Sequence, residues 1–313
     1  MKFRNSFLSK ILKFVILGGL LLYIFFLIFK DWSVSYKYIQ DLNLFFLLTS
    51  LPFFLIIYPE GAYCWYVVLK FLKLKVSLLN VISVWVVSNT SRYIPGSVWQ
   101  YFSRVFLSEK ILKISKTDAT ASSILEIFFV LSGSIIISLF ALKVLDDFDS
   151  RFIYSLLCLV LIVFLFYSRI LKFFLLLLRK ILKRNINVDN YVISFIDLLK
   201  IIPFFVLNFL INGLAIYLLI LAFNFDLEVI HVLTLSGFYS LAWFLGYISF
   251  FSPGGLGITE VSLTYFLSLL IPIELSPIIA VFYRLFLTLG ELVVFLFFLN
   301  RKEFKKKIFK YEH

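Results

Sequence analysis

The sequence predicts an all-α, polytopic integral membrane helical bundle. Its composition excludes an ordinary soluble fold, because 62% of the 313 residues are apolar and only 15% are charged, whereas soluble domains average about 45 to 50% apolar residues. Apolar runs near the ~20 residues needed to cross the hydrocarbon core recur along the chain. Two further apolar runs are interrupted by Pro-Gly. We therefore expect about six full spans and two broken, re-entrant helical hairpins.

Six segments have the length and the flanking charge of complete spans. They cover approximately residues 12–29, 44–69, 119–142, 152–168, 199–222 and 277–299. The first follows a basic N-terminal segment, but its apolar run exceeds that of a typical signal peptide and no A-x-A-like cleavage site accompanies it. We expect this segment to be an uncleaved first span.

Two apolar stretches, 76–108 and 230–271, contain Pro-Gly breaks that begin at Pro95 and Pro253. The arm after each break is only about a dozen residues long, which is too short to cross the bilayer at 1.5 Å per residue. Each stretch is therefore predicted to enter the membrane, break near the midplane and return. The distribution of basic residues between the two sides of the membrane is the same for such a hairpin and for two full crossings, so it does not distinguish them.

The net charge of +12 would suit a nucleic-acid-binding protein, but the placement of the basic residues favours a membrane. With both hairpins re-entrant, 23 of the 30 basic residues fall on the side of the two termini and four fall on the other. The positive-inside rule then places both termini in the cytoplasm. We expect a multi-pass protein of a prokaryotic cytoplasmic membrane, with anionic or phosphate-bearing lipids rather than nucleic acids as partners.

Opposed hairpins predict an inverted repeat, a common arrangement in transporters. The expected organisation is one domain, 1–313, with half-repeats at about 44–142 and 199–299 linked by 143–198. Glu126 lies 31 residues after Pro95, and Arg284 lies 31 residues after Pro253. Charges at membrane depth almost always have a partner, so we expect Glu126 and Arg284 to form an ion pair. Such a pair would either contact a substrate or only brace the packing.

Polar residues around the two breaks form a candidate translocation site. A helix that begins after a break presents unpaired N–H groups and the positive end of its dipole, which together favour an anion. Arginines would strengthen that preference, while glutamates would hold the arginines, receive a cationic group or carry a proton. The candidate residues are Arg92, Pro95, Gly96, Arg104, Glu126, Pro253, Gly254, Gly255, Gly257, Glu260, Arg284 and Glu291. Glu60 also lies at membrane depth.

The sequence predicts neither a metal site nor a cofactor. His231 and His313 are the two histidines, and neither stands in a metal-ligand motif. Cys64 and Cys158 lie in separate apolar runs and are expected to be inert buried thiols. Without a histidine or clustered-aspartate site to supply a nucleophile or hold a metal, we do not expect an enzyme.

Four segments resemble one known family: SRYIPGSVWQYFSR (91–104), SSILEIFFVLSG (122–133), FFSPGGLGITE (250–260) and AVFYRLFLTLGE (280–291). At these motifs the sequence is similar to the flippase-like family defined by the transmembrane region of lysylphosphatidylglycerol synthases. Trp99 and Thr259 depart from the pattern of many members.

The resemblance implies a lipid flippase that moves phospholipids, or polyprenyl or glycolipid head groups, across the cytoplasmic membrane. The aminoacyl-transferase domain of the two-part synthases is not expected here, because the chain ends at RKEFKKKIFKYEH. The alternative is a non-transporting membrane accessory of an envelope-lipid or surface-polysaccharide pathway, which would bind an enzyme of that pathway. The sequence does not indicate an oligomeric state.

Overall fold

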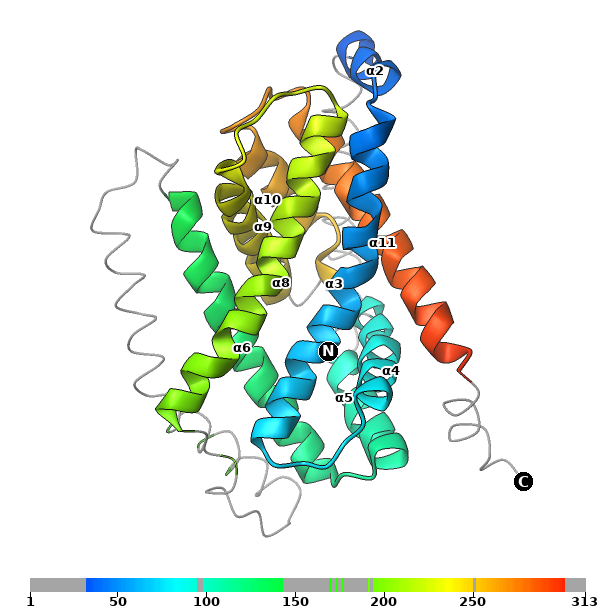
Figure 1. Cartoon of the computed structure of the whole chain (residues 1–313), viewed down its shortest axis with the longest axis vertical. Coiled ribbons are helices and arrows are strands. Elements are labelled where there is room, and N and C mark those ends of the chain that lie inside the picture. The colour runs from blue at the N-terminus through cyan, green and yellow to red at the C-terminus, as the bar shows by residue number, and fades with distance from the viewer. Residues whose placement is uncertain are drawn as a thin grey trace, which may run out of the picture.

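The computed structural model describes residues 32–94, 98–142, 194–249 and 252–301, together with residues 169, 173, 176 and 191. All regular elements within these residues are helical (Figure 1). In chain order they are α2 (Trp32–Gln40), α3 (Leu44–Phe71), α4 (Leu78–Asn89), η1 (Thr90–Tyr93), α5 (Trp99–Leu107), η2 (Ser108–Leu112), α6 (Lys116–Leu142), α8 (Phe195–Ala222), α9 (His231–Ile248), η4 (Pro253–Gly255), α10 (Ile258–Leu267) and α11 (Ser276–Leu299).

Four of these helices, α3, α6, α8 and α11, are long and apolar enough to cross a membrane. They confirm that the predicted spans 44–69, 119–142, 199–222 and 277–299 are membrane-length helices. The predicted spans 12–29 and 152–168 lie outside the described residues. The chain is thus a multi-pass membrane protein.

Serine side chains cap the first turns of α6 and α8. Ser115 Oγ accepts a hydrogen bond from the Asp118 N–H at 3.0 Å, and Ser194 Oγ accepts one from the Asp197 N–H at 3.2 Å. These bonds satisfy N–H groups that a first helical turn leaves without a partner. The sequence therefore sets the starts of both spans with polar residues that precede the apolar runs.

The two broken stretches form short helical pairs, as predicted. The first hairpin consists of α4, η1 and α5, and the second consists of α9, η4 and α10. The return arms α5 and α10 have 9 and 10 residues, so each extends only about 15 Å, roughly half of a ~30 Å hydrocarbon core. The first break is bounded by η1 and α5, and residues 95–97 between them lie outside the described residues.

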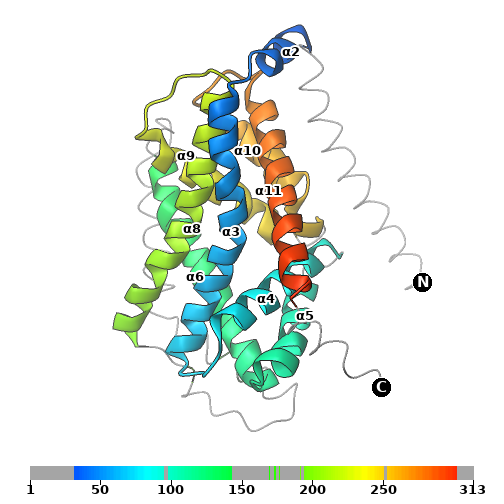
Figure 2. The same ribbon diagram turned by 45° about the vertical axis from the view of Figure 1, so that its right-hand side comes forward.

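The two hairpins occupy opposite ends of the bundle. In Figures 1 and 2, α4 and α5 lie beside the C-terminal half of α3, whereas α9 and α10 lie towards its N-terminal end. Their tips meet, because η1 contacts η4 and a Cβ atom at Gly254 would lie 3.1 Å from Tyr93 Cε1. The segment that leads into the first break is thus packed against the second break. The symmetry of an inverted repeat stays a prediction.

Glycines give the second tip a backbone that other residues rarely adopt. The φ angles of Gly254, Gly255 and Gly257 are 60°, 75° and 81°, in the left-handed region where glycine carries no Cβ penalty. At Gly255 a Cβ would also lie 2.7 Å from Thr259 Oγ1. The PGGLG motif is therefore required by the turn itself, before any ligand is considered.

The α5 helix is polar on its inner face and apolar on its outer face. Gln100 and Arg104, which form a polar stripe on one face of the helix, are buried, while Trp99, Phe102 and Phe106 are exposed. In a bilayer the exposed aromatic face contacts lipid, so burial of the polar stripe is the arrangement that hydrocarbon favours. The stripe directs Arg104 towards the interior of the bundle.

Small residues let the helices approach closely, as is common in membranes. Gly237 of α9 faces Ala141 of α6 so closely that a Cβ on the glycine would lie 2.7 Å from the alanine Cβ and 2.8 Å from its backbone nitrogen. Backbone cannot yield as a flexible side chain can. This contact therefore fixes the distance between α6 and the second hairpin.

We predict that Gly237→Val lowers the free energy of unfolding by about 1–3 kcal/mol, because the added methyl groups overpack this contact. Leu245→Val, on an exposed position of the same helix, serves as the control and should change stability little. Thermal unfolding of both variants in detergent measures the difference. Equal melting temperatures would show that α6 and α9 separate without cost.

Candidate functional site

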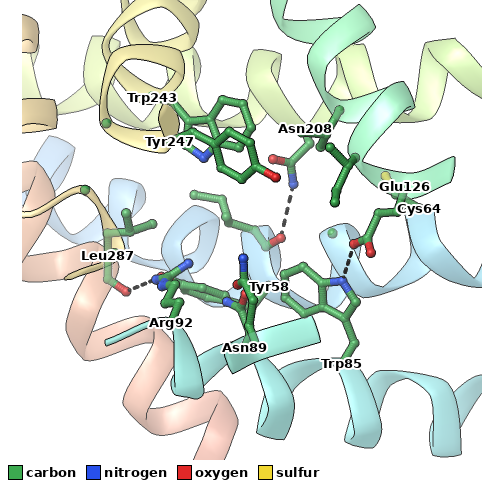
Figure 3. A pocket seen from close by; sticks show the side chains of 18 of the residues that line it. Tyr58, Cys64, Trp85, Asn89, Arg92, Glu126, Asn208, Trp243, Tyr247 and Leu287 are labelled. Carbon is green, nitrogen blue, oxygen red and sulfur yellow. Dashed lines mark hydrogen bonds between the residues drawn. The ribbon is translucent and has the colours of Figure 1, made fainter. Parts of the chain in front are cut away.

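A pocket of about 180 Å³ lies inside the bundle, between the two hairpins. By the same measure one water molecule needs only ~10–15 Å³, so the space accommodates a group much larger than water. Side chains from α3, α4, α5, α6, α8, α9 and α11, and from both hairpin tips, form its wall. Figure 3 shows these side chains converging on a common space.

Arg92, at the first tip, enters the pocket beside a carboxylate that is almost fully enclosed. Its Nη2 lies 2.7 Å from Glu291 Oε2, and the exposed fractions of the two side chains are 21% and 4%. Tyr93 donates to the same oxygen at 2.6 Å, and Asn89 Nδ2 donates to Glu291 Oε1 at 3.3 Å. Glu291 therefore holds Arg92 from behind, while the guanidinium lines the pocket.

Arg284, on α11, has the second carboxylate as its partner. Its Nε lies 3.0 Å from Glu260 Oε1, and its Nη2 donates to the carbonyl oxygen of Gly254 at 3.3 Å. The 3.0 Å contact is an ion pair whose alignment does not meet the geometry of a hydrogen bond. Arg92 Nε likewise has no acceptor. Arg92 and Arg284 thus each retain a buried N–H that has no acceptor among the described residues and that an anion could use.

The start of α10 differs from the prediction. We expected unpaired N–H groups to be available there, but Glu260 Oε2 accepts the Gly257 N–H at 2.6 Å and caps the helix with its own third residue. The Gly257 N–H is therefore not available to an anion, and the expected anion site at the rest of this first turn stays a prediction. A glutamate three residues into a helix can reach back to the capping position.

Arg104 and Glu126 form a third ion pair at the pocket wall, and aromatic rings surround the guanidinium. The guanidinium carbon lies 5.2 Å from the ring centres of Trp65 and Trp85 and 5.7 Å from that of Tyr101. Trp85 Nε1 also donates to Glu126 Oε1 at 2.6 Å (Figure 3). The side chains of Arg104 and Glu126 are only 2% and 9% exposed, so this pair braces α5 against α6.

The predicted ion pair between Glu126 and Arg284 was wrong. Glu126 pairs with Arg104, and Arg284 pairs with Glu260. In each case the partner lies on the return arm of the hairpin that precedes the charged helix, so the nearest opposite charge is supplied locally. In both pairs a return arm contacts the long helix that follows it. The arginine lies on the return arm in the first pair and on the long helix in the second.

The structure gathers most of the predicted site residues at the pocket. Those that line it are Arg92, Arg104, Glu126, Gly254, Gly255 and Arg284. Glu260 and Glu291 stand behind the arginines, and Pro253 and Gly257 shape the second tip. Pro95 and Gly96 lie outside the described residues.

Three arginines but only one glutamate line the pocket. The arginines project into the space, whereas two of their three carboxylate partners are withdrawn into the packing. The described part of the wall is therefore positive on its inner side. Such a wall favours a phosphate or a carboxylate, and an arginine fork matches either group with two hydrogen bonds.

Sequence reasoning missed the aromatic part of the wall. Tyr101 and Tyr247 bring their hydroxyl oxygens within 3.0 Å and so join the first hairpin to the second. Trp243 stacks on Tyr247 with ring centres 5.0 Å apart, as Figure 3 shows. Tyr58 adds hydrogen bonds to the Leu287 carbonyl and to Glu291 at 3.2 and 3.5 Å.

The family model described as the lysylphosphatidylglycerol synthase TM region matches residues 10–294. This range contains both hairpins, the four charged residues of the pocket wall and the carboxylates behind the arginines. No curated protein and no solved structure matches the chain. The match confirms the resemblance found in the motifs and indicates a membrane protein related to lipids.

We predict that Arg104→Met lowers the free energy of unfolding by about 3–5 kcal/mol, because it leaves Glu126 buried without its cation. The double variant Arg104→Met/Glu126→Leu should recover most of that loss, since it removes both charges. Thermal unfolding in detergent measures both.

The exposed pair of Lys116 and Glu109, 3.2 Å apart with side chains 50% and 48% exposed, supplies the control. Lys116→Met should change stability by less than about 1 kcal/mol. A double variant no more stable than Arg104→Met would refute this bracing role.

Proposed function

The chain belongs to the family of the lysylphosphatidylglycerol synthase transmembrane region, and from this membership we propose that it is a lipid flippase. In this proposal the pocket receives a phosphate-bearing head group while the acyl chains stay in the bilayer. The head group then passes between the two hairpins from one leaflet to the other. The lipids are phospholipids or polyprenyl and glycolipids with an anionic group.

The observation that carries the proposal is the pair of arginines at the meeting point of the two tips. Arg92 stands beside the first break and Arg284 contacts the second. Each is held by a buried carboxylate and each keeps an Nε–H without an acceptor. Guanidinium groups held in place in this way are suited to a phosphate, which accepts several charge-assisted hydrogen bonds at once.

The broken helices support the same conclusion. Non-helical backbone at membrane depth is stable only when it is buried in protein or lines a watery cavity. Here the two breaks meet at one pocket, and hairpins at opposite ends of the bundle provide elements that could open to each side in turn. Discontinuous helices around a central site are a recurring arrangement in transporters.

We assign no catalytic reaction to the chain within this proposal. Membrane lipids are the proposed partners. From the basic flanks of the spans we also propose that the protein lies in the cytoplasmic membrane of a prokaryote, with both termini in the cytoplasm. A non-transporting accessory of an envelope-lipid or surface-polysaccharide pathway is the alternative. In that case the three ion pairs would only stabilise the bundle.

Flipping can be measured with purified protein in liposomes that contain a fluorescent NBD-labelled phosphatidylglycerol and are quenched from outside with dithionite. We expect the wild type to move the probe from the inner to the outer leaflet, where dithionite quenches its fluorescence. Arg92→Gln and Arg284→Gln should each lower the rate by about tenfold or more, because hydrogen bonds to charged groups contribute about 1.5–3 kcal/mol.

Lys200→Gln is a matched control, because its side chain is 62% exposed and its ion-pair partner in the described part of the chain is Asp197 of the same helix. Its rate should equal that of the wild type. The same assay with a neutral NBD-labelled diacylglycerol, which flips without protein, checks the integrity of the quench. Folded Arg92→Gln and Arg284→Gln variants with unchanged rates would favour the accessory.

A further inference from the structure

Glu60 differs from the carboxylates of the ion pairs in the membrane interior. It lies near the middle of α3, far from both ends of that span. Glu126, Glu260 and Glu291 each face an arginine. Within the described ranges, by contrast, no lysine or arginine forms an ion pair with Glu60.

The neighbours that bind Glu60 are neutral. Asn208 Nδ2 donates to Glu60 Oε2 and also to the Ile57 carbonyl, the latter at 3.2 Å. Cys64 Sγ, one turn along α3, lies 3.2 Å from Glu60 Oε1. An ionised carboxylate with only neutral partners is costly at membrane depth. A protonated carboxyl avoids that cost, and its oxygens can still accept the hydrogen bonds from the Cys64 thiol and the Asn208 amide.

The charged groups on the elements packed against this part of α3 are already engaged. Glu126 of α6 is bound to Arg104, and Glu291 of α11 is bound to Arg92 of η1. From α4 the neighbour is the uncharged Trp85, and from α8 it is Asn208. Among the described neighbours, Glu60 is thus the carboxyl group whose charge no ion pair fixes.

A polar connection joins Glu60 to the pocket. Asn208 and Cys64, which bind its carboxyl group, both line the cavity (Figure 3). From Asn208 the hydrogen bonds continue through Asn212 to Tyr283, which precedes the pocket arginine Arg284. Glu60 therefore lies directly behind the wall, where entry of water would give it a proton acceptor.

We propose that Glu60 is a proton-carrying site that couples lipid movement to a proton gradient, an inference that rests on the proposed flippase function. In the conformation described above, the carboxyl group holds a proton. When the pocket opens to one side, its O–H bond breaks and water takes the proton. When the pocket opens to the other side, water there returns one, so that one proton crosses in each cycle.

The protonation state can be tested without any lipid. At neutral pH, the infrared spectrum of the purified wild type should contain the C=O stretch of a protonated carboxyl group. This band should shift when H2O is replaced by D2O. Glu60→Gln should lose this band, and Glu109→Gln, on the exposed Glu109, should keep it. The proposal would be overturned if the wild type and Glu60→Gln had the same spectrum in this region. Because glutamine resembles the protonated acid in shape, Glu60→Gln should also have the same melting temperature as the wild type.

Coupling is tested in the NBD-phosphatidylglycerol liposomes with a gradient of one pH unit. One proton per lipid shifts the steady-state ratio between leaflets by about tenfold. Glu60→Gln should still exchange the probe without a gradient but should lose the shift.

A shift driven by sodium instead, or a wild type that exchanges lipid and ignores the pH gradient, would overturn the coupling. A wild type that moves no lipid contradicts the flippase function, whereas the infrared band still reports whether Glu60 holds a proton.

Discussion

The contact between the two hairpin tips is the constraint on which the rest of the structure depends. Each tip exposes backbone that hydrocarbon cannot satisfy, so neither break is stable unless protein covers it. Tyr93 of the first tip lies on Gly254 of the second, and both tips line one pocket together with residues of α3, α6, α8 and α11. The same contact places Arg92 and Arg284 at one pocket, so stability and site geometry share a single cause.

The three ion pairs divide into two kinds by their surroundings. Arg104 and Glu126 line the pocket, but indole and phenol rings surround the guanidinium and both side chains are almost fully buried. Arg92 and Arg284 are more open, and their carboxylates lie deeper than they do. A pair in which both members are buried holds helices together, whereas an arginine held from behind stays available to a ligand. The exposure of the arginine, rather than its charge, separates the two roles.

The sequence contains enough information for the spans, the breaks and the depth of the charges. Apolar length predicts a span, and Pro-Gly within an apolar run predicts a break, because both follow from local physics. The partner of Glu126 was not predictable, because spacing along a helix gives depth but not the direction in which a side chain points. The Tyr101–Tyr247 contact was not predictable either, since aromatic residues make up 20% of the chain and two more do not stand out.

Glu260 serves two neighbours at once. One carboxylate oxygen closes the first turn of α10 through Gly257, and the other lies beside Arg284, which also contacts the Gly254 carbonyl. An anion that draws Arg284 towards itself loosens its hold on both the glutamate and the glycine turn. Anion binding in the pocket and the rigidity of the second tip therefore depend on the same side chain, Arg284.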